Sequence, residues 1–156
     1  MVENDRWLKL FETKGGRVTG PRRAIVNLMV QTDLALSPIE VFDKARGYYP
    51  KMGLVTVYRT LEILSELGLI ERVHQANGCH MYVRSAVGHK HTMLCTNCKR
   101  FASFSGDDLE ELIQKVSSES GFLIQSHYLQ MQGLCEKCKS NHKKNQLAGL
   151  AKTEQA

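Results

Sequence analysis

The cysteines are the residues of this 156-residue chain whose spacing most directly predicts chemistry. Four of them form two C-x2-C pairs, Cys95 with Cys98 and Cys135 with Cys138. Each two-residue gap makes a tight turn that aims both sulfurs at one point, so four thiolates can surround one Zn²⁺ tetrahedrally. Residues 99–134 separate the pairs, so a helix and a strand must fold between them. We predict a structural zinc site made by these four cysteines.

Two other uses of the cysteines are less favoured by the sequence. A disulfide framework suits neither the odd count of five cysteines nor the acidic opening residues, which are unlike a secretory signal. A redox-active C-x-x-C motif normally occurs once, before a helix in a βαβ unit. The remaining thiol, Cys79, has two open interpretations: it packs inside a strand, or it binds a metal together with the adjacent His80.

Histidines form a second group of candidate metal ligands. His89 and His91 lie two residues apart on an expected strand, so both imidazoles face the same side and can reach one ion. His127 on a later expected strand and Glu110 in the first turn of an expected helix are the further candidates. Taken alone, His127 is better explained as a hydrogen-bonded core histidine, and Glu110 as part of a solvated helix face.

Composition and charge restrict the class of protein. With 42% hydrophobic and 24% charged residues and a mean hydropathy of −0.30, the chain is typical of a globular protein, which excludes collagen, coiled coil and wholesale disorder. No apolar run approaches the roughly 18 residues of a membrane span, and we expect a cytoplasmic protein. The net charge of +5 is concentrated in acid-free stretches at 14–23 and 137–152, which permits a nucleic-acid partner without requiring one.

The first half of the chain has the pattern of helices followed by a hairpin. Helices are expected over 5–13, from Pro21 onward, from the capping box of Ser37 and Glu40 to near 49, and over 54–67. Strands at 69–73 and 79–83 flank the turn dipeptide Asn77-Gly78. This order predicts a winged helix-turn-helix, with a generic helical domain carrying a hairpin as the alternative.

The second half is expected to be a small α/β domain after a hinge at 84–88. Strands are predicted at 91–95 and 100–104, and a long strand at 122–131. Between them, a second capping box of Ser105 and Asp108 begins a helix that ends at Gly121 and turns its apolar side inward. That inward side comprises Leu109, Leu112, Ile113 and Val116.

The fold class is therefore α+β, with a winged helix-turn-helix at 1–84, a small α/β domain that contains the predicted zinc site at 85–141, and a disordered basic tail at 142–156. The second domain is too small to bury a self-sufficient core, so zinc and a partner subunit are expected to support it.

Five segments, in this order, carry a resemblance to a known family. They are Arg17-Val-Thr-Gly-Pro-Arg22, Gly53-Leu-Val-Thr-Val-Tyr-Arg-Thr-Leu61, Gly68-Leu-Ile, His89-Lys-His-Thr-Met-Leu-Cys-Thr-Asn-Cys98 and His127-Tyr-Leu-Gln-Met-Gln-Gly-Leu-Cys135. The chain resembles the ferric uptake regulator (Fur) family of metal-dependent bacterial transcription repressors. The resemblance implies a homodimer that binds palindromic, A/T-rich double-stranded DNA operators and controls metal uptake or oxidative-stress genes.

The resemblance also implies roles for individual residues. Cys95, Cys98, Cys135 and Cys138 match the structural zinc site, and His89, His91, Glu110 and His127 match a regulatory site for Zn²⁺, Fe²⁺ or Mn²⁺. The family's usual sensing site at the domain hinge does not match, because this chain has other residues at its ligand positions. Those residues are Leu36, Val83, Lys90, Thr92 and Ser103.

DNA contacts follow from the same comparison. Thr56, Tyr58 and Arg59 match the major-groove face of the recognition helix, Arg17 a minor-groove contact, and Arg22 a phosphate contact. The alternative for each of them is an ordinary surface side chain.

Two other functions stay open: a zinc-dependent hydrolytic enzyme that uses the His/Glu/His set with a bound water, and a peroxide-responsive regulator of the same family. We expect no enzymatic activity, because a hydrolase has no use for the helix-hairpin half.

Overall fold

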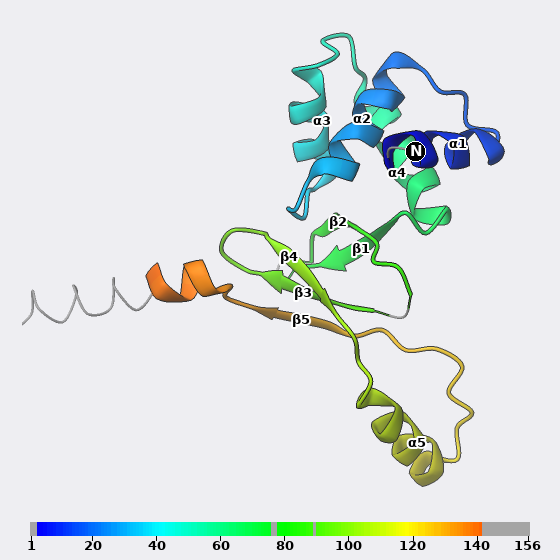
Figure 1. Cartoon of the computed structure of the whole chain (residues 1–156), viewed down its shortest axis with the longest axis vertical. Coiled ribbons are helices and arrows are strands. Elements are labelled where there is room, and N and C mark those ends of the chain that lie inside the picture. The colour runs from blue at the N-terminus through cyan, green and yellow to red at the C-terminus, as the bar shows by residue number, and fades with distance from the viewer. Residues whose placement is uncertain (1–2, 76–77, 89, 142–156) are drawn as a thin grey trace, which may run out of the picture. The chain divides into compact units, whose positions relative to one another are not determined.

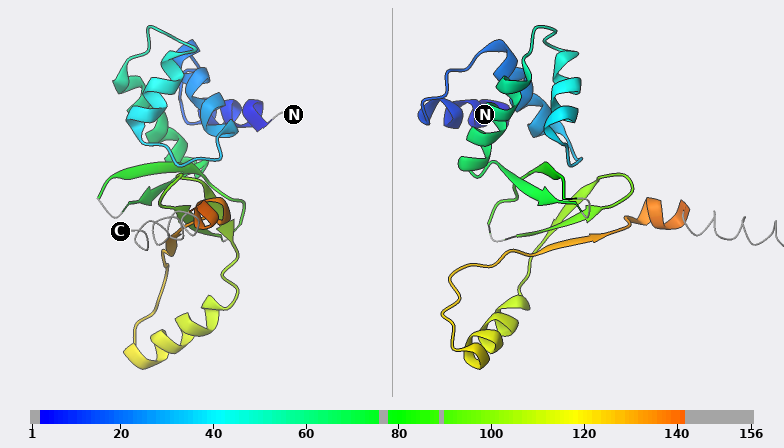
Figure 2. Two further views of the ribbon diagram at one scale, coloured as in Figure 1. Left: turned by 90° about the vertical axis from the view of Figure 1, so that its left-hand side faces the viewer. Right: turned by 180° about the vertical axis from the view of Figure 1, so that it is seen from behind.

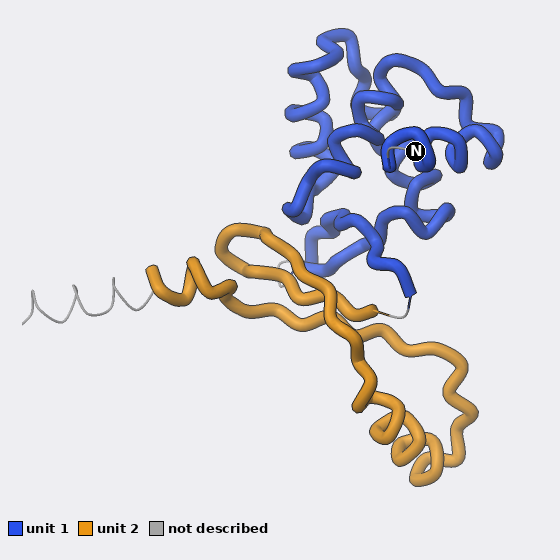
Figure 3. The backbone as a smooth tube through the Cα atoms, in the orientation of Figure 1, with its two compact units in different colours: residues 1–89 blue, residues 90–156 orange. Residues whose placement is uncertain are grey.

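The computed structural model describes residues 3–75, 78–88 and 90–141, which belong to two compact units, residues 1–89 and 90–156 (Figure 3). The ligand expected at His89 and the tail expected to be disordered at 142–156 lie outside the described residues. Among the described helices, none is long and apolar enough to cross a membrane.

The first unit begins with four helices (Figure 1): α1 (Glu3–Thr13), α2 (Gly20–Gln31), α3 (Pro38–Arg46) and α4 (Leu54–Glu66). The predicted capping box begins α3, because Ser37 Oγ accepts from the Glu40 N–H at 3.3 Å and the Ser37 N–H donates to Glu40 Oε2 at 2.8 Å. Helix α3 ends at Arg46, earlier than expected, since the N–H groups of Tyr48 and Tyr49 both turn back to the Ala45 carbonyl. The helices share a core that includes Phe11, Ile25, Val57 and Leu61.

A β-hairpin completes this unit. Helix α4 ends before Gly68, whose φ of +66° reverses the chain into β1 (Ile70–His74), which pairs antiparallel with β2 (His80–Arg84). Leu36 adds a third, single-bridge strand, because its N–H and carbonyl exchange hydrogen bonds of 3.0 and 2.8 Å with Tyr82. The winged helix-turn-helix prediction is confirmed.

The second unit contains a three-stranded sheet, a helix at 109–120 and a short helix at 136–141 that follows the last strand (Figure 2). The central strand β3 (His91–Cys95) pairs antiparallel with β4 (Phe101–Phe104) and parallel with β5 (Gln130–Gly133), in the order β4-β3-β5. Helix α5 (Leu109–Ser120) lies between β4 and β5 in the chain. It ends at Gly121, as predicted, where φ is +73°. The predicted α+β class is confirmed.

The long strand predicted at 122–131 is wrong. Only Gln130–Gly133 pairs with β3, and the described residues 122–129 have no strand assignment. Apolar and aromatic side chains are common in this segment, but such a run makes a strand only where a neighbouring strand accepts its backbone hydrogen bonds. Phe122 and Leu123 are consequently 74% and 84% exposed, and His127 lies outside any strand.

Two expectations about α5 are also wrong. Its N-cap, Asp108, has helical backbone angles and makes no side-chain cap hydrogen bond, because the Leu109 N–H bonds to the Gly106 carbonyl at 2.9 Å and closes a turn instead. The helix buries no side chain in this single chain, although its apolar residues lie on one side. Leu112 is 56% exposed and Val116 44%, so these two residues of the stripe predicted to face inward are left uncovered within the described chain.

Candidate metal centres and nucleic-acid interface

The four cysteines of the predicted zinc site converge. They come from the end of β3, the turn that follows it, and the segment after β5, and their sulfur atoms all lie within 4.8 Å of one another. The Cys98 and Cys135 sulfurs are 3.6 Å apart. A tetrahedral zinc–thiolate centre with bonds of about 2.3 Å places its sulfurs roughly 3.8 Å apart. The cluster therefore fits a structural Zn²⁺.

Backbone hydrogen bonds fix the two cysteine turns. The Cys95 N–H donates to the Arg100 carbonyl at 2.8 Å, and the Lys99 N–H returns to the Cys95 carbonyl at 3.0 Å. Lys99 closes this turn in the left-handed region, with φ of +61°, which is unusual for a residue with a Cβ. The Thr96 N–H donates to the Gly133 carbonyl at 2.9 Å and joins the first turn to β5.

The thiols also show why a cation is needed. Burial raises the pKa of Cys95, but hydrogen bonds from the backbone of Cys135, Cys98 and Asn97 outweigh it and lower that pKa to about 6. At Cys138 a hydrogen bond from the Asn97 side chain lowers the pKa, whereas burial and the three neighbouring cysteines raise it further, to about 12. One thiolate forms readily and a full set repels itself, so a divalent cation is what allows four thiolates together.

Two of the four predicted regulatory ligands lie together. His91, the first residue of β3, is 4% exposed, and its ring centroid is 5.2 Å from that of His127. Two imidazoles on one ion, with metal–nitrogen bonds of about 2.0–2.1 Å, place their centroids roughly 4.5–5.2 Å apart. A Cβ at Gly106 would clash with the His91 ring at Nε2 and Cδ2, so the backbone of residue 106 packs directly against the imidazole.

Of the other two predicted ligands, Glu110 is not brought to this pair. Glu110 is exposed in the first turn of α5, and His89 lies outside the described residues. Within the described parts of the chain, the four cysteines are the one set of three or more His, Cys, Asp or Glu residues with ligand atoms within 4.8 Å of one another. The complete His/His/Glu/His site stays a prediction.

The hinge positions carry no imidazole or carboxylate. Leu36 and Val83 are buried apolar side chains, and Thr92 pairs with Ser103 across β3 and β4. Lys90 is exposed and would repel a metal ion.

Helix α4 presents a distinct exposed face. Val57, Leu61 and Leu64 are fully buried, whereas Tyr58 is 48% exposed, Arg59 is exposed and Thr56 is half-buried. The sequence analysis did not single out Val55, which is 64% exposed. The helical period contains the signal, since residue 55 lies one turn before 58 and 59 on the same side. A tyrosine, an arginine and a valine there are suited to a DNA major groove, in which thymine methyls and guanine edges are read.

The two arginines before and within α2 have different settings. Arg17 is exposed. Arg22 Nη1 donates to the Arg17 carbonyl at 2.8 Å, and its guanidinium lies 5.6 Å from the centre of the Phe11 ring. Arg22 therefore holds the loop that presents Arg17.

A winged helix with an exposed recognition face, joined to a unit with a thiolate metal cluster, defines a metal-dependent DNA-binding regulator. The model of the ferric uptake regulator family matches residues 13–132, and the chain belongs to this family. Its members are metal-responsive transcription regulators rather than enzymes, which sets the hydrolase alternative aside.

The chain is similar to family members that are named for peroxide, iron and zinc. The peroxide operon regulator of Bacillus subtilis is 27% identical over 86% of this chain and 94% of its own length. The ferric uptake regulation protein of Bordetella parapertussis is 30% identical over 82% of this chain and 93% of its own. Among solved structures, a zinc uptake regulator complexed with zinc and DNA has a TM-score of 0.69 and 22% identity, with 90% of this chain and 95% of that chain covered.

The cysteine cluster gives the first prediction. Cys95→Ser removes the buried thiol with the lowered pKa, so we expect the protein to lose its tightly bound zinc, measured by elemental analysis after mild chelation. Cys79→Ser is the matched control, because Cys79 is exposed and outside the cluster, and it should keep one zinc per subunit. Full zinc content in Cys95→Ser would contradict the structural assignment.

Proposed function

We propose that this chain is a homodimeric repressor that binds palindromic, A/T-rich operators in the cytoplasm and responds to a divalent metal. Residues 1–84 would bind DNA, and residues 85–141 would form the dimer and hold both metals. The observation that carries the proposal is the exposed Tyr58–Arg59 face of α4 in a winged helix, in the same chain as the four-cysteine cluster. Gene targets of metal uptake or oxidative stress follow from family membership.

The α4 face suits base reading. Arg59 can form a bidentate contact with a guanine edge, while Tyr58 and the nearby Val55 can pack against thymine methyl groups. Arg17, on the loop that Arg22 holds, is placed to enter a narrow A/T-rich minor groove. The zinc uptake regulator of the same fold is complexed with zinc and DNA, which supports DNA binding by this chain.

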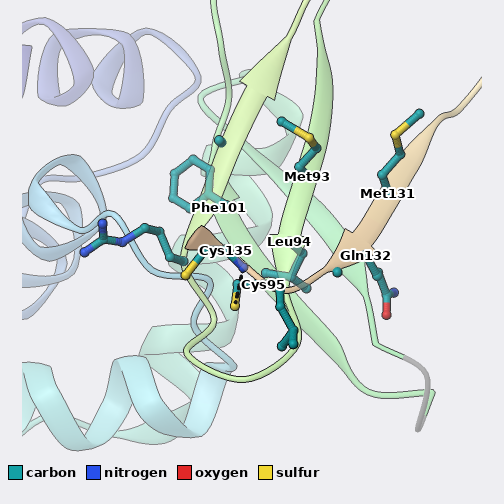
Figure 4. Close-up of a pocket in the computed structure, with 11 residues that line it drawn as sticks. Met93, Leu94, Cys95, Phe101, Met131, Gln132 and Cys135 are labelled. Carbon is teal, nitrogen blue, oxygen red and sulfur yellow. Dashed lines mark hydrogen bonds between the residues drawn. The ribbon is translucent and has the colours of Figure 1, made fainter. Parts of the chain in front are cut away.

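A second copy of the chain is the occupant that best suits the apolar surfaces of the second unit. Helix α5 leaves Leu112 and Val116 exposed. On the sheet, Met93 and Met131 are paired in register on neighbouring strands and are 41% and 47% exposed (Figure 4). A hollow of about 500 Å³ lies beside them. Both surfaces belong to one unit, so two copies can cover each other's helix and sheet. Such a contact would bury the apolar surface that this small domain cannot bury by itself.

The regulatory metal is assigned to His89, His91, Glu110 and His127. His91 begins β3, Glu110 begins α5, and His127 lies in the segment that leads into β5. A metal that joined them would order the 122–129 segment against the sheet and would fix α5, which the dimer contact uses. Because the metal would bind this arrangement in preference to others, it would shift the population of dimers towards the form that fits the operator.

A peroxide-responsive regulator is the second candidate. The Bacillus subtilis relative favours it, whereas the residues at Leu36, Val83, Lys90, Thr92 and Ser103 weigh against it, because they offer no hinge ligands for an iron that would direct histidine oxidation. Operator release from the iron-loaded protein on addition of peroxide would favour this candidate over metal sensing alone.

The recognition helix gives the second prediction. Arg59→Ala should weaken operator binding by roughly 1–3 kcal/mol and relax specificity at one base, measured by fluorescence anisotropy over a salt series. Lys115→Ala, which removes the same charge from exposed α5, is the control and should bind as the parent does. Equal affinity of Arg59→Ala and the parent for operator and random DNA would remove α4 from the interface.

The dimer surface gives the third. Leu112→Asp places a charge in the exposed apolar stripe of α5. The dissociation constant of the dimer, measured by sedimentation equilibrium, should therefore rise at least about tenfold, while zinc is retained. Gln114→Asp, on the same helix, adds the same charge at an exposed polar position and should leave the dimer intact. An undiminished Leu112→Asp dimer would place the interface elsewhere.

The regulatory site gives the fourth. His127→Ala should leave the structural zinc and the dimer in place but abolish the metal-dependent gain in operator affinity, titrated separately with Zn²⁺, Fe²⁺ and Mn²⁺. His142→Ala removes a histidine outside the predicted set and serves as the control. A full metal response in His127→Ala would show that sensing occurs at another site.

A further inference from the structure

The wing hairpin carries a second pair of histidines that the proposed function does not use. His74 is the last residue of β1 and His80 the first residue of β2, and the two are direct partners in the antiparallel register. Their ring centroids are 4.9 Å apart, with the ring planes at 75°. Both residues are exposed, so solvent ions reach them.

The backbone accounts for this proximity. The Gln75 N–H donates to the Cys79 carbonyl at 3.1 Å, and the Gly78 N–H donates to the Gln75 carbonyl at 3.0 Å. Gly78 adopts a φ of +77°, which closes the turn. Since residues 75 and 79 form the hydrogen-bonded pair, His74 and His80 form the next, non-hydrogen-bonded pair, in which opposite side chains approach most closely.

The spacing of these rings matches shared coordination. Two imidazoles on one ion have centroids roughly 4.5–5.2 Å apart when the nitrogen–metal–nitrogen angle is between a right angle and the tetrahedral angle. The observed 4.9 Å lies within that range. Neutral imidazole prefers borderline cations such as Zn²⁺, Ni²⁺ and Cu²⁺ over Mg²⁺ or Ca²⁺, which take oxygen ligands.

We propose that His74 and His80 form a surface site for a borderline divalent cation, with Zn²⁺ as its biological occupant. Cys79 precedes His80, so strand alternation points its thiol to the opposite face of the hairpin, and the assigned protein ligands are the two imidazoles. Water completes the coordination. With two protein ligands instead of four, the site binds more weakly than the cysteine cluster and empties first on chelation.

A metal here joins β1 to β2 beside the turn of the wing. It therefore stiffens the hairpin and adds positive charge at its end. The effect on DNA binding rests on the proposed function: in a winged helix bound to DNA, the added charge lies where the wing approaches the phosphates.

The test is a Zn²⁺ titration of the full-length, zinc-loaded His127→Ala protein by calorimetry, in which the regulatory set is disabled. We expect one further Zn²⁺ per subunit, with its affinity reduced at least about tenfold by either His74→Gln or His80→Gln. Cys79→Ser, the neighbouring control, should leave this binding unchanged. Unaltered binding in both glutamine variants, or a loss in Cys79→Ser as large as in them, would overturn the assignment.

A second measurement does not depend on how the two glutamine variants fold. In the His127→Ala protein with its wing unaltered, the imidazole NMR signals of His74 and His80 should shift together during the titration, and unmoved signals would also overturn the site. No DNA is present, so this failure leaves the proposed function standing, whereas failure of the Arg59→Ala test would leave the wing site standing.

Discussion

The crowding of four thiols within 4.8 Å is the constraint on which the second unit depends. Its apolar core is very small: among the described residues from 90 onward, Leu94 is the one buried aliphatic side chain, and the buried cysteines Cys95 and Cys138 belong to the cluster itself. Burial of so little apolar surface cannot offset the entropy of ordering three strands. Metal–thiolate bonds must therefore contribute to the folding free energy, because they join the end of β3 to the segment after β5.

The first unit has the opposite balance. Its core contains Trp7, Phe11, Ile25, Met29 and Leu64, all at most 3% exposed, and no metal is needed to hold them. Loss of zinc should thus leave the winged helix folded and, on the proposed function, would prevent two chains from pairing. The division of labour explains how such a small chain can read DNA and respond to ions: one unit is stabilised by apolar packing, and the other remains sensitive to its ligands.

The sequence predicted the features that short-range rules determine. The C-x2-C spacing, the Ser37 capping box, the helix ends at Gly68 and Gly121 and the wing hairpin each depend on a few neighbouring residues, and the structure contains all of them. The predictions that failed depended on distant partners. Residues 122–129 are rich in strand-forming side chains but pair with no described strand, and Leu112 and Val116 of α5 have no surface to cover them in one chain. The His74–His80 pairing also required the hairpin register, which the turn dipeptide alone did not define.

Strand β3 connects the cysteine cluster with the candidate regulatory pair of the second unit. Its first residue, His91, is in the candidate regulatory pair, and its last residue, Cys95, is in the zinc cluster. On the neighbouring side, His127 precedes β5 and Cys135 follows it, so the same two paired strands are held by zinc at one end and would be held by the regulatory ion at the other. The zinc end is fixed by backbone hydrogen bonds, whereas the His127 end begins as an irregular segment. On the proposed function, order gained at that end would propagate towards α5, because residues 121–129 lead directly from α5 to β5, and the metal would then act on dimer geometry rather than on the DNA-reading surface itself.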